Sequence, residues 1–269
     1  MNKRKKQRNA SKTLPLHTLT KGHKKTRIRH QQRKLGEERP GLHCKSTTKI
    51  MITKIFFEKV FSLDRMEPYF KLYPGDEKTA IKHYECNIKL SEACYVFLSV
   101  LEVALRNAMI RELVKYTGSN DWYNFFLANP KLRSTHRYIR EAEKHIIERG
   151  ETVSPAKMNA EFTLGFWVSL LNSEHEKQLW KSLRKAFPNM PKPIRKRKNV
   201  SAPLNRMRAF RNRVFHNESI CWNLVYVEKF HREMLKVMDW INQDLVVWET
   251  NVDRFDNVCS DIRKDMNWI

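Results

Sequence analysis

Glycine is scarce in this sequence, at 7 of 269 residues. Hairpin turns and phosphate-binding loops need the positive backbone angles that glycine adopts most easily, so this scarcity argues against a β-rich fold. Long apolar runs are lacking too, which predicts no transmembrane helix and no membrane partner. The basic start of the chain is not followed by an apolar core with a small-residue cleavage site, so we expect no secretory signal.

Paired cysteines are a further absence. The five cysteines are odd in number and show no C-x-x-C spacing, and the histidines form no H-E-x-x-H pair. These patterns indicate neither a disulfide framework nor a zinc site, and we predict no metal and no other cofactor. A cytoplasmic location with free thiols is the expectation.

Acidic residues are outnumbered: 29 Asp and Glu stand against 52 Lys and Arg, a formal net charge of +23. Residues 1–50 hold 16 of these bases and only two acids, a net charge of +14, and have almost no periodic apolar residues. Such a segment cannot offset its chain entropy by burial, so a disordered basic tail is predicted. Three interpretations of this tail remain open: a nucleic-acid-binding arm, an inert tail, or sequence upstream of a true start at Met51.

Residues 51–269 are predicted to form one all-α domain. Apolar residues recur at helical spacing between Asp76 and Tyr116, with Asp76 as the N-cap and Gly118 as the stop signal. We expect one long helix there, or two end to end. A further helix is expected to begin at Ser201, and a last amphipathic helix to span 224–248. The aromatic-rich segment 121–126 is predicted to be a loop or short turn.

Candidate catalytic residues cluster between residues 206 and 218. On a helix Asn212 and His216 are four residues apart and share a face, and Arg211 can reach around to them. His can move a proton near neutral pH, Arg can stabilise charge on phosphate oxygens, and Asn can orient a substrate. From the residues alone, a solvated basic helix face remains the competing interpretation.

Several segments occur in one order along the chain. They are Tyr84-x-x-Asn87-x-x-Leu90-Ser91, Leu101-Glu102-Val103-Ala104-Leu105-Arg106-Asn107-Ala108, Asp121-Trp122-Tyr123, Leu164-Gly165-Phe166-Trp167, Leu179-Trp180 and Arg208-x-x-Arg211-Asn212-Arg213-x-x-His216-x-Glu218. In this order and spacing, over about residues 51–248, the chain resembles the Abi-like (abortive infection) branch of the HEPN superfamily of helical ribonucleases and RNA-binding proteins.

The resemblance implies a HEPN-type helical bundle that forms a homodimer, with two Arg/His helices facing each other across an RNA-cutting groove. It implies metal-independent cleavage, in which the RNA 2′-OH attacks the adjacent phosphate. Carried over by motif, Arg211 is the charge stabiliser, His216 the acid and base, and Asn212 the orienting residue. RNA and an antitoxin protein are the partners that it suggests.

Other residues around the motif are assigned supporting roles. Glu102, Arg106, Asn107 and Glu218 are predicted to form a supporting network; the i,i+4 pair Glu102 and Arg106 either braces the motif helix or contacts RNA directly. Arg208 and Arg213 are either phosphate contacts or solvated charges. For Trp122, Phe166 and Trp167, core packing is favoured over base stacking.

Three functions are compatible with the sequence. The first is an endoribonuclease acting in phage defence or as a toxin that cuts cellular RNA. The second is a non-catalytic HEPN-fold module that binds RNA or a protein, and the third is a structural all-α protein without a nucleic-acid role. RNA cleavage that depends on His216 separates the first from the second, and RNA binding at low salt separates the second from the third.

Overall fold

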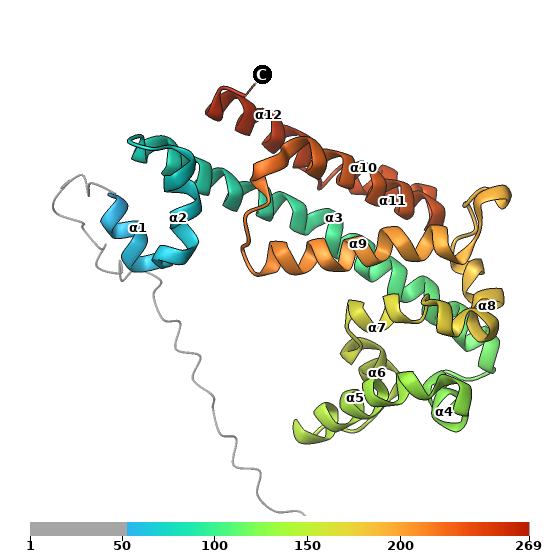
Figure 1. The fold of residues 1–269 in the computed structure, drawn as a ribbon. Coiled ribbons are helices and arrows are strands. Elements are labelled where there is room, and N and C mark those ends of the chain that lie inside the picture. Colours follow the sequence, from blue (N-terminus) through green and yellow to red (C-terminus); the bar gives the residue numbers. More distant parts are fainter. Residues whose placement is uncertain (1–52, 269) are drawn as a thin grey trace, which may run out of the picture. The chain divides into compact units, whose positions relative to one another are not determined.

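The computed structural model describes residues 53–268. The disorder predicted for residues 1–50 lies outside these residues. The described elements all belong to the unit Met51–Ile269, and among them are helices and no strands (Figure 1). The prediction of an all-α fold is therefore confirmed for this part of the chain.

The α-helices are α1 (Lys54–Phe61), α2 (Leu63–Leu72), α3 (Glu77–Thr117), α4 (Trp122–Ala128), α5 (His136–Glu148), α6 (Pro155–Glu161), α7 (Leu164–Ser169), α8 (Lys181–Leu183), α9 (Arg197–Phe215), α10 (Leu224–Ile241), α11 (Gln243–Glu249) and α12 (Phe255–Met266). Short 3₁₀ or π turns fill most of the connections: η1 (Pro130–Thr135), η2 (Ser173–His175), η3 (Glu176–Trp180), η4 (Arg184–Ala186), η5 (Lys192–Ile194) and η6 (Cys221–Asn223).

The central element is α3, a single helix of 41 residues. Asp76 caps its start, because its Oδ1 accepts the N–H of Thr79 at 3.0 Å. Gly118 ends it in the left-handed conformation and donates its N–H to the carbonyl of Val114 at 2.8 Å. Both helix boundaries expected from the sequence are confirmed.

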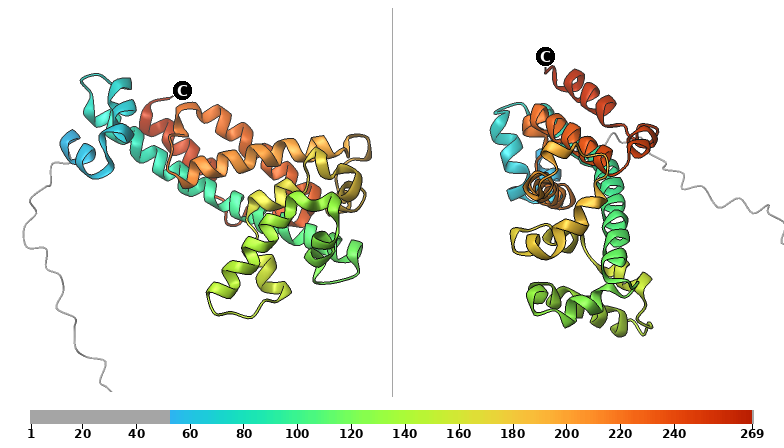
Figure 2. Two further views of the ribbon diagram at one scale, coloured as in Figure 1. Left: turned by 60° about the horizontal axis from the view of Figure 1, so that its bottom comes forward. Right: turned by 90° about the vertical axis from the view of Figure 1, so that its right-hand side faces the viewer.

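Helix α3 forms the main core with elements that pack along it, chiefly α9, α10 and α12, and a second, smaller core with α1 and α2. Figures 1 and 2 show α1 and α2 near its N-terminal end and α4 to α6 near its C-terminal end. By length and composition alone α3 could cross a membrane, contrary to the expectation that no such segment exists. Core helices pass the same test, and a stripe of buried residues from Ala80 to Leu113 faces the bundle.

The C-terminal region differs from the sequence prediction. The helix expected over 224–248 is broken at Asn242, which has an extended backbone (φ −162°, ψ 126°) and caps α11 by accepting the N–H of Asp244 at 2.8 Å. Asn competes for backbone hydrogen bonds and therefore starts a new helix here. Helix α12 was not predicted.

Two further predictions about helix boundaries were wrong. Residues 121–126 are mostly helical, since they include the start of α4, and α9 begins at Arg197, ahead of the predicted start at Ser201. The prediction that three aromatic residues pack in the core is confirmed. Trp122, Phe166 and Trp167 are almost fully buried and pack on one another, so they belong to the core and do not form an exposed stacking platform.

Candidate functional site at the end of helix α9

The predicted catalytic motif lies where α9 ends. Asn212 is exposed in the last turn, and the N–H of His216 donates to its carbonyl at 2.9 Å, so the two residues are one helical turn apart as expected. His216 itself is the C-cap, with its side chain exposed to solvent. The chain then turns back at Asn217, whose φ of 50° is left-handed.

This turn is a Schellman motif. The N–H of Asn217 donates to the carbonyl of Val214 at 3.0 Å, and the N–H of Glu218 donates to the carbonyl of Arg213 at 2.9 Å. These bonds satisfy carbonyls that the end of a helix otherwise leaves without partners. Asn tolerates the left-handed conformation better than most residues, so Asn217 has a conformational reason to follow His216.

Helix α2 holds the turn from one side. The guanidinium of Arg65 donates to the carbonyl of Asn217 at 2.8 Å and to that of His216 at 3.4 Å. The hydroxyl of Tyr69 lies 2.6 Å from the Ser219 hydroxyl. Burial raises the pKa of Tyr69 to about 12, so its phenol stays neutral. The backbone of His216 is therefore anchored to an element far away in the sequence.

Asn87 of α3 holds the same turn from within the core. It is 1% exposed. Its Oδ1 accepts the backbone N–H groups of Ile220 at 2.7 Å and Cys221 at 3.0 Å, and its Nδ2 donates to the carbonyl of Glu218 at 3.3 Å. One amide thus satisfies three backbone groups of a loop that has no helical partner for them.

Sequence reasoning missed Arg65 and did not assign Asn87 a site role. An amide at a core-facing position of an apolar helix was the available signal for Asn87, because buried polar groups need partners. No local pattern marks Arg65, since its partners are more than a hundred residues further along the chain.

Arg211 is the half-buried member of the motif. Its Nε lies 3.4 Å from Oε2 of Glu102 without hydrogen-bond alignment. Its guanidinium carbon lies 4.3 Å from the centre of the Phe215 ring, a cation–π distance. These contacts hold the stem of Arg211 between α3 and the last turn of α9.

The ion pair expected between Glu102 and Arg106 is not formed. Glu102 pairs instead with Arg211 of the neighbouring helix, since α3 and α9 lie in contact. Among residues 53–268, Arg106 makes no ion pair and Asn107 is exposed. The supporting network predicted from sequence is therefore reduced to the Glu102–Arg211 contact on this side.

The two flanking arginines differ from each other. Arg213 donates from Nη2 to the carbonyl of Ser219 at 2.6 Å and from Nε to the carboxylate of Glu218 at 3.2 Å, so it closes the turn. Arg208 is exposed, and its Cδ lies beside Gly165 of α7. Of the two, only Arg208 has a guanidinium available to a phosphate.

An apolar groove of about 320 Å³ lies beside the motif. Its walls are the exposed faces of α3 and the end of α9, lined by Ile88, Ser91, Glu92, Tyr95, Val214, Phe215 and Asn217. The rings of Tyr95 and Phe215 are 5.6 Å apart, and each residue is about half exposed (53% and 45%). Ile88 is 45% exposed.

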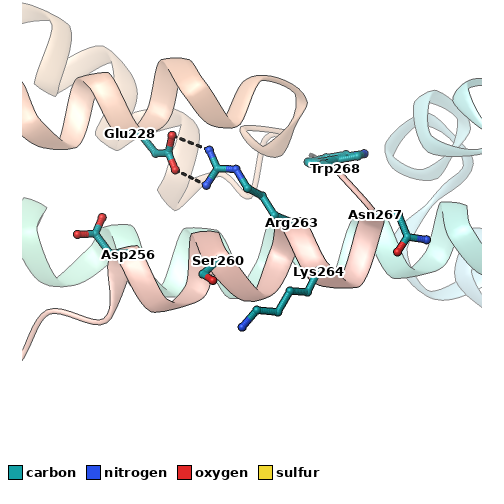
Figure 3. Close-up of a pocket in the computed structure, with 7 residues that line it drawn as sticks. All are labelled: Glu228, Asp256, Ser260, Arg263, Lys264, Asn267 and Trp268. Atoms are coloured by element: carbon teal, nitrogen blue, oxygen red, sulfur yellow. Dashed lines mark hydrogen bonds and ion pairs between the residues drawn. The ribbon is translucent and has the colours of Figure 1, made fainter.

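A larger pocket of about 700 Å³ lies elsewhere, between α10 and α12 (Figure 3). Arg263 crosses it and donates to both oxygens of Glu228, at 2.6 and 2.8 Å. The pair lowers the pKa of the Glu228 carboxyl. Because its main charges are already paired, this pocket offers less chemistry than the end of α9.

Potential metal ligands do come together in the described residues, although no short motif predicted them. His231, Glu249 and Asp253 lie in one group, and none of them belongs to the predicted catalytic motif. The group is built from three elements, so spacing along the sequence could not reveal it.

No family model, curated protein or solved structure matches the chain.

Proposed function

We propose that the protein is a metal-independent endoribonuclease of the Abi-like branch of the HEPN superfamily, acting in the cytoplasm in phage defence or as a toxin. The observation that carries this proposal is the end of α9, where an exposed histidine and an oriented arginine sit on a turn anchored by α2 and α3. The order of sequence segments described above supports it independently.

The chemistry follows from the residues at this turn. The 2′-OH of RNA attacks the adjacent phosphorus, the bond to the 5′ oxygen breaks, and a 2′,3′-cyclic phosphate and a 5′-OH result. His216 is exposed and has a nitrogen to accept and return the proton. Glu102 contacts Arg211 on its Nε side, which leaves the two Nη groups to stabilise the phosphorane oxygens. Asn212, exposed one turn earlier, orients the substrate.

A second copy of the chain would complete the groove. The exposed apolar residues Ile88, Tyr95 and Phe215 line one groove, and the Phe215 ring contacts the guanidinium of Arg211. Apolar surface grouped beside polar catalytic candidates is typical of a protein interface. In a homodimer built on this face, two copies of the motif would line one RNA path.

The test compares wild type with His216→Ala and Arg211→Ala on total RNA and on tRNA in EDTA, with the ends mapped chemically. Wild type should leave 2′,3′-cyclic phosphate ends. Both variants should fold like wild type and cleave RNA at least a hundredfold more slowly. Matched controls on α5 are His145→Ala and Arg137→Ala, which remove an exposed histidine and an exposed arginine. Full activity in both motif variants would refute the proposal.

One observation favours a non-catalytic RNA-binding module as the alternative. Glu102 offsets part of the charge of Arg211, which weakens its pull on a phosphorane. In that case wild type should bind RNA without yielding product, and His216→Ala should bind equally well. Binding should fall steeply with salt.

A further inference from the structure

Two buried side chains and one partly buried side chain meet where α10, α11 and α12 join. They are His231 in the middle of α10, Glu249 at the last position of α11, and Asp253 in the loop before α12. One ligand atom from each lies within 4.8 Å of the others. His231 is 3% exposed and Glu249 is fully buried.

The local backbone brings the two carboxylates together. The carbonyl of Glu249 accepts the N–H groups of Val252 at 3.0 Å and Asp253 at 2.9 Å, so the chain folds back sharply after α11. Oδ1 of Asp253 accepts the N–H of Phe255 at 2.9 Å, where α12 begins. That bond leaves Oδ2 of Asp253 facing inward, toward His231.

Aromatic rings enclose the imidazole. The rings of Phe97 and Phe255 have centroids 4.8 and 4.2 Å from that of His231. Glu249 is fully buried beside this enclosed imidazole, so a charge on its carboxylate needs a partner within the cluster.

Glu249 lacks that partner. Neither of its carboxylate oxygens has a hydrogen-bond partner in the described structure. The imidazole of the cluster, that of His231, already lies next to Asp253. The cluster therefore has two acids for one imidazole.

The spacing of His231 and Asp253 is compatible with two ligands of one ion. Nε2 of His231 is 2.9 Å from Oδ2 of Asp253, yet the two atoms are not aligned for a hydrogen bond. Ligands bonded to one metal at about 2.0–2.2 Å, with angles of 90–110° between the bonds, lie about 3 Å apart without pointing at each other. The contact therefore has a length that an ion pair also shows, and its lack of alignment is compatible with two ligands of one ion.

We propose that His231, Glu249 and Asp253 bind one divalent transition-metal ion, Zn²⁺ before others. One imidazole nitrogen and two carboxylate oxygens form a mixed N/O set that suits Zn²⁺, whereas Mg²⁺ favours oxygen ligands alone. The ion supplies the positive charge that the cluster lacks and links α10, α11 and the start of α12. Asp253 lies at the edge of the cluster, with its side chain 12% exposed, and marks the side from which a water can serve as the fourth ligand.

The test is titration of the full-length, chelator-treated protein with ZnCl₂, followed by calorimetry and thermal unfolding. Wild type should bind Zn²⁺, and its midpoint of unfolding should rise. Glu249→Gln, which keeps the shape of the side chain and removes its charge, should weaken the tightest site at least tenfold and abolish the thermal shift. Asp253→Asn should do the same. MgCl₂ should produce no shift in wild type.

Controls separate this site from adventitious binding. His145 and Glu161 form an exposed pair 3.0 Å apart on α5 and α6, so His145→Gln removes a candidate surface site and should leave the affinity unchanged. X-ray absorption of protein loaded with less than one equivalent should show nitrogen and oxygen ligands and no sulfur. Equal Zn²⁺ affinity in wild type and Glu249→Gln, or a sulfur ligand, would overturn the proposal. RNA cleavage plays no part in this readout, so its outcome is independent of the proposed function.

Discussion

Replacing Glu249 by Gln should stabilise the protein in the presence of a chelator. Glu249 is fully buried and both of its carboxylate oxygens lack hydrogen-bond partners. Without a metal, its charged form has to be carried in a low-dielectric site beside Asp253. The Gln side chain has nearly the same volume and is neutral at every pH, so it removes this penalty.

The magnitude follows from the pKa. Burial first, and Asp253 second, raise the pKa of Glu249 from 4.5 to about 7, and such a displacement corresponds to about 3 kcal/mol of folding free energy. Because the pKa of Glu249 is higher in the folded state than in the unfolded state, the protonated side chain costs the fold nothing below pH 4.5. The free energy of unfolding of wild type falls as the pH rises through 7, and the full cost of the buried charge is present at pH values above 7.

Urea unfolding in EDTA at pH 5 and pH 8 measures this difference. At pH 8 the Glu249→Gln variant should exceed wild type by about 2–3 kcal/mol, or about 5–10 °C in the unfolding midpoint. At pH 5 the two should agree within about 1 kcal/mol. Saturating Zn²⁺ should reduce this difference at pH 8, because wild type binds the ion more tightly than the variant.

The matched control is Glu112→Gln on α3. Glu112 is also buried (6% exposed), but its carboxylate is 2.7 Å from the ammonium of Lys115. Removing this charge breaks an ion pair, so the control variant should be no more stable than wild type at pH 8. If Glu249→Gln and wild type have equal free energies of unfolding at both pH values in EDTA, the reasoning about an unpartnered buried carboxylate is wrong.

Three other predictions concern the turn after α9. Asn87→Ala should cost about 2–5 kcal/mol in urea unfolding, because buried backbone groups lose their partners, whereas Asn107→Ala, exposed on the same helix, should change it by less than about 0.5 kcal/mol. Asn217→Ala should cost about 1 kcal/mol and Asn217→Gly nearly nothing, since φ is 50° there; equal losses would exclude a conformational role. Phe215→Asp should shift sedimentation from dimer to monomer and reduce RNA cleavage, while Val247→Asp, at an apolar residue that is 70% exposed on α11, should do neither.

The fold was predictable where the helical spacing of apolar residues continues over many turns, as it does in α3. The periodicity and caps of α3 agree, so local and global signals indicate the same helix. The break at Asn242 was missed because the apolar pattern of α10 continues into α11, and only a capping side chain interrupts it. Helix α12 escaped notice because its apolar residues complete the core through contacts with α3, which are remote in sequence.

At the end of α9, the turn shared by two motif residues was predictable from the sequence, but the contacts around it were not. The spacing of Asn212 and His216 gave their shared turn correctly. The predicted ion pair of Glu102 with Arg106 was wrong, because the i,i+4 rule considers residues of one helix, whereas Glu102 pairs with Arg211 of another helix. The anchors Arg65 and Asn87 lie more than a hundred residues before the turn, beyond the reach of any local pattern.

The ion pairs of α9 also reduce the number of its arginine side chains that are available to phosphates. Arg206 is bound by Glu233, Arg211 by Glu102, and Arg213 by Glu218, so each of these charges already has an acid beside it. Counterion release from RNA requires cations that reach phosphates, and on this helix Arg208 is the member of the motif best placed to do so. For the proposed ribonuclease, high affinity for RNA would therefore have to come from elsewhere in the chain, and the basic residues 1–50 carry a net charge of +14. Under that proposal the end of α9 would contribute position more than charge, by holding Arg211 and His216 at the scissile phosphate.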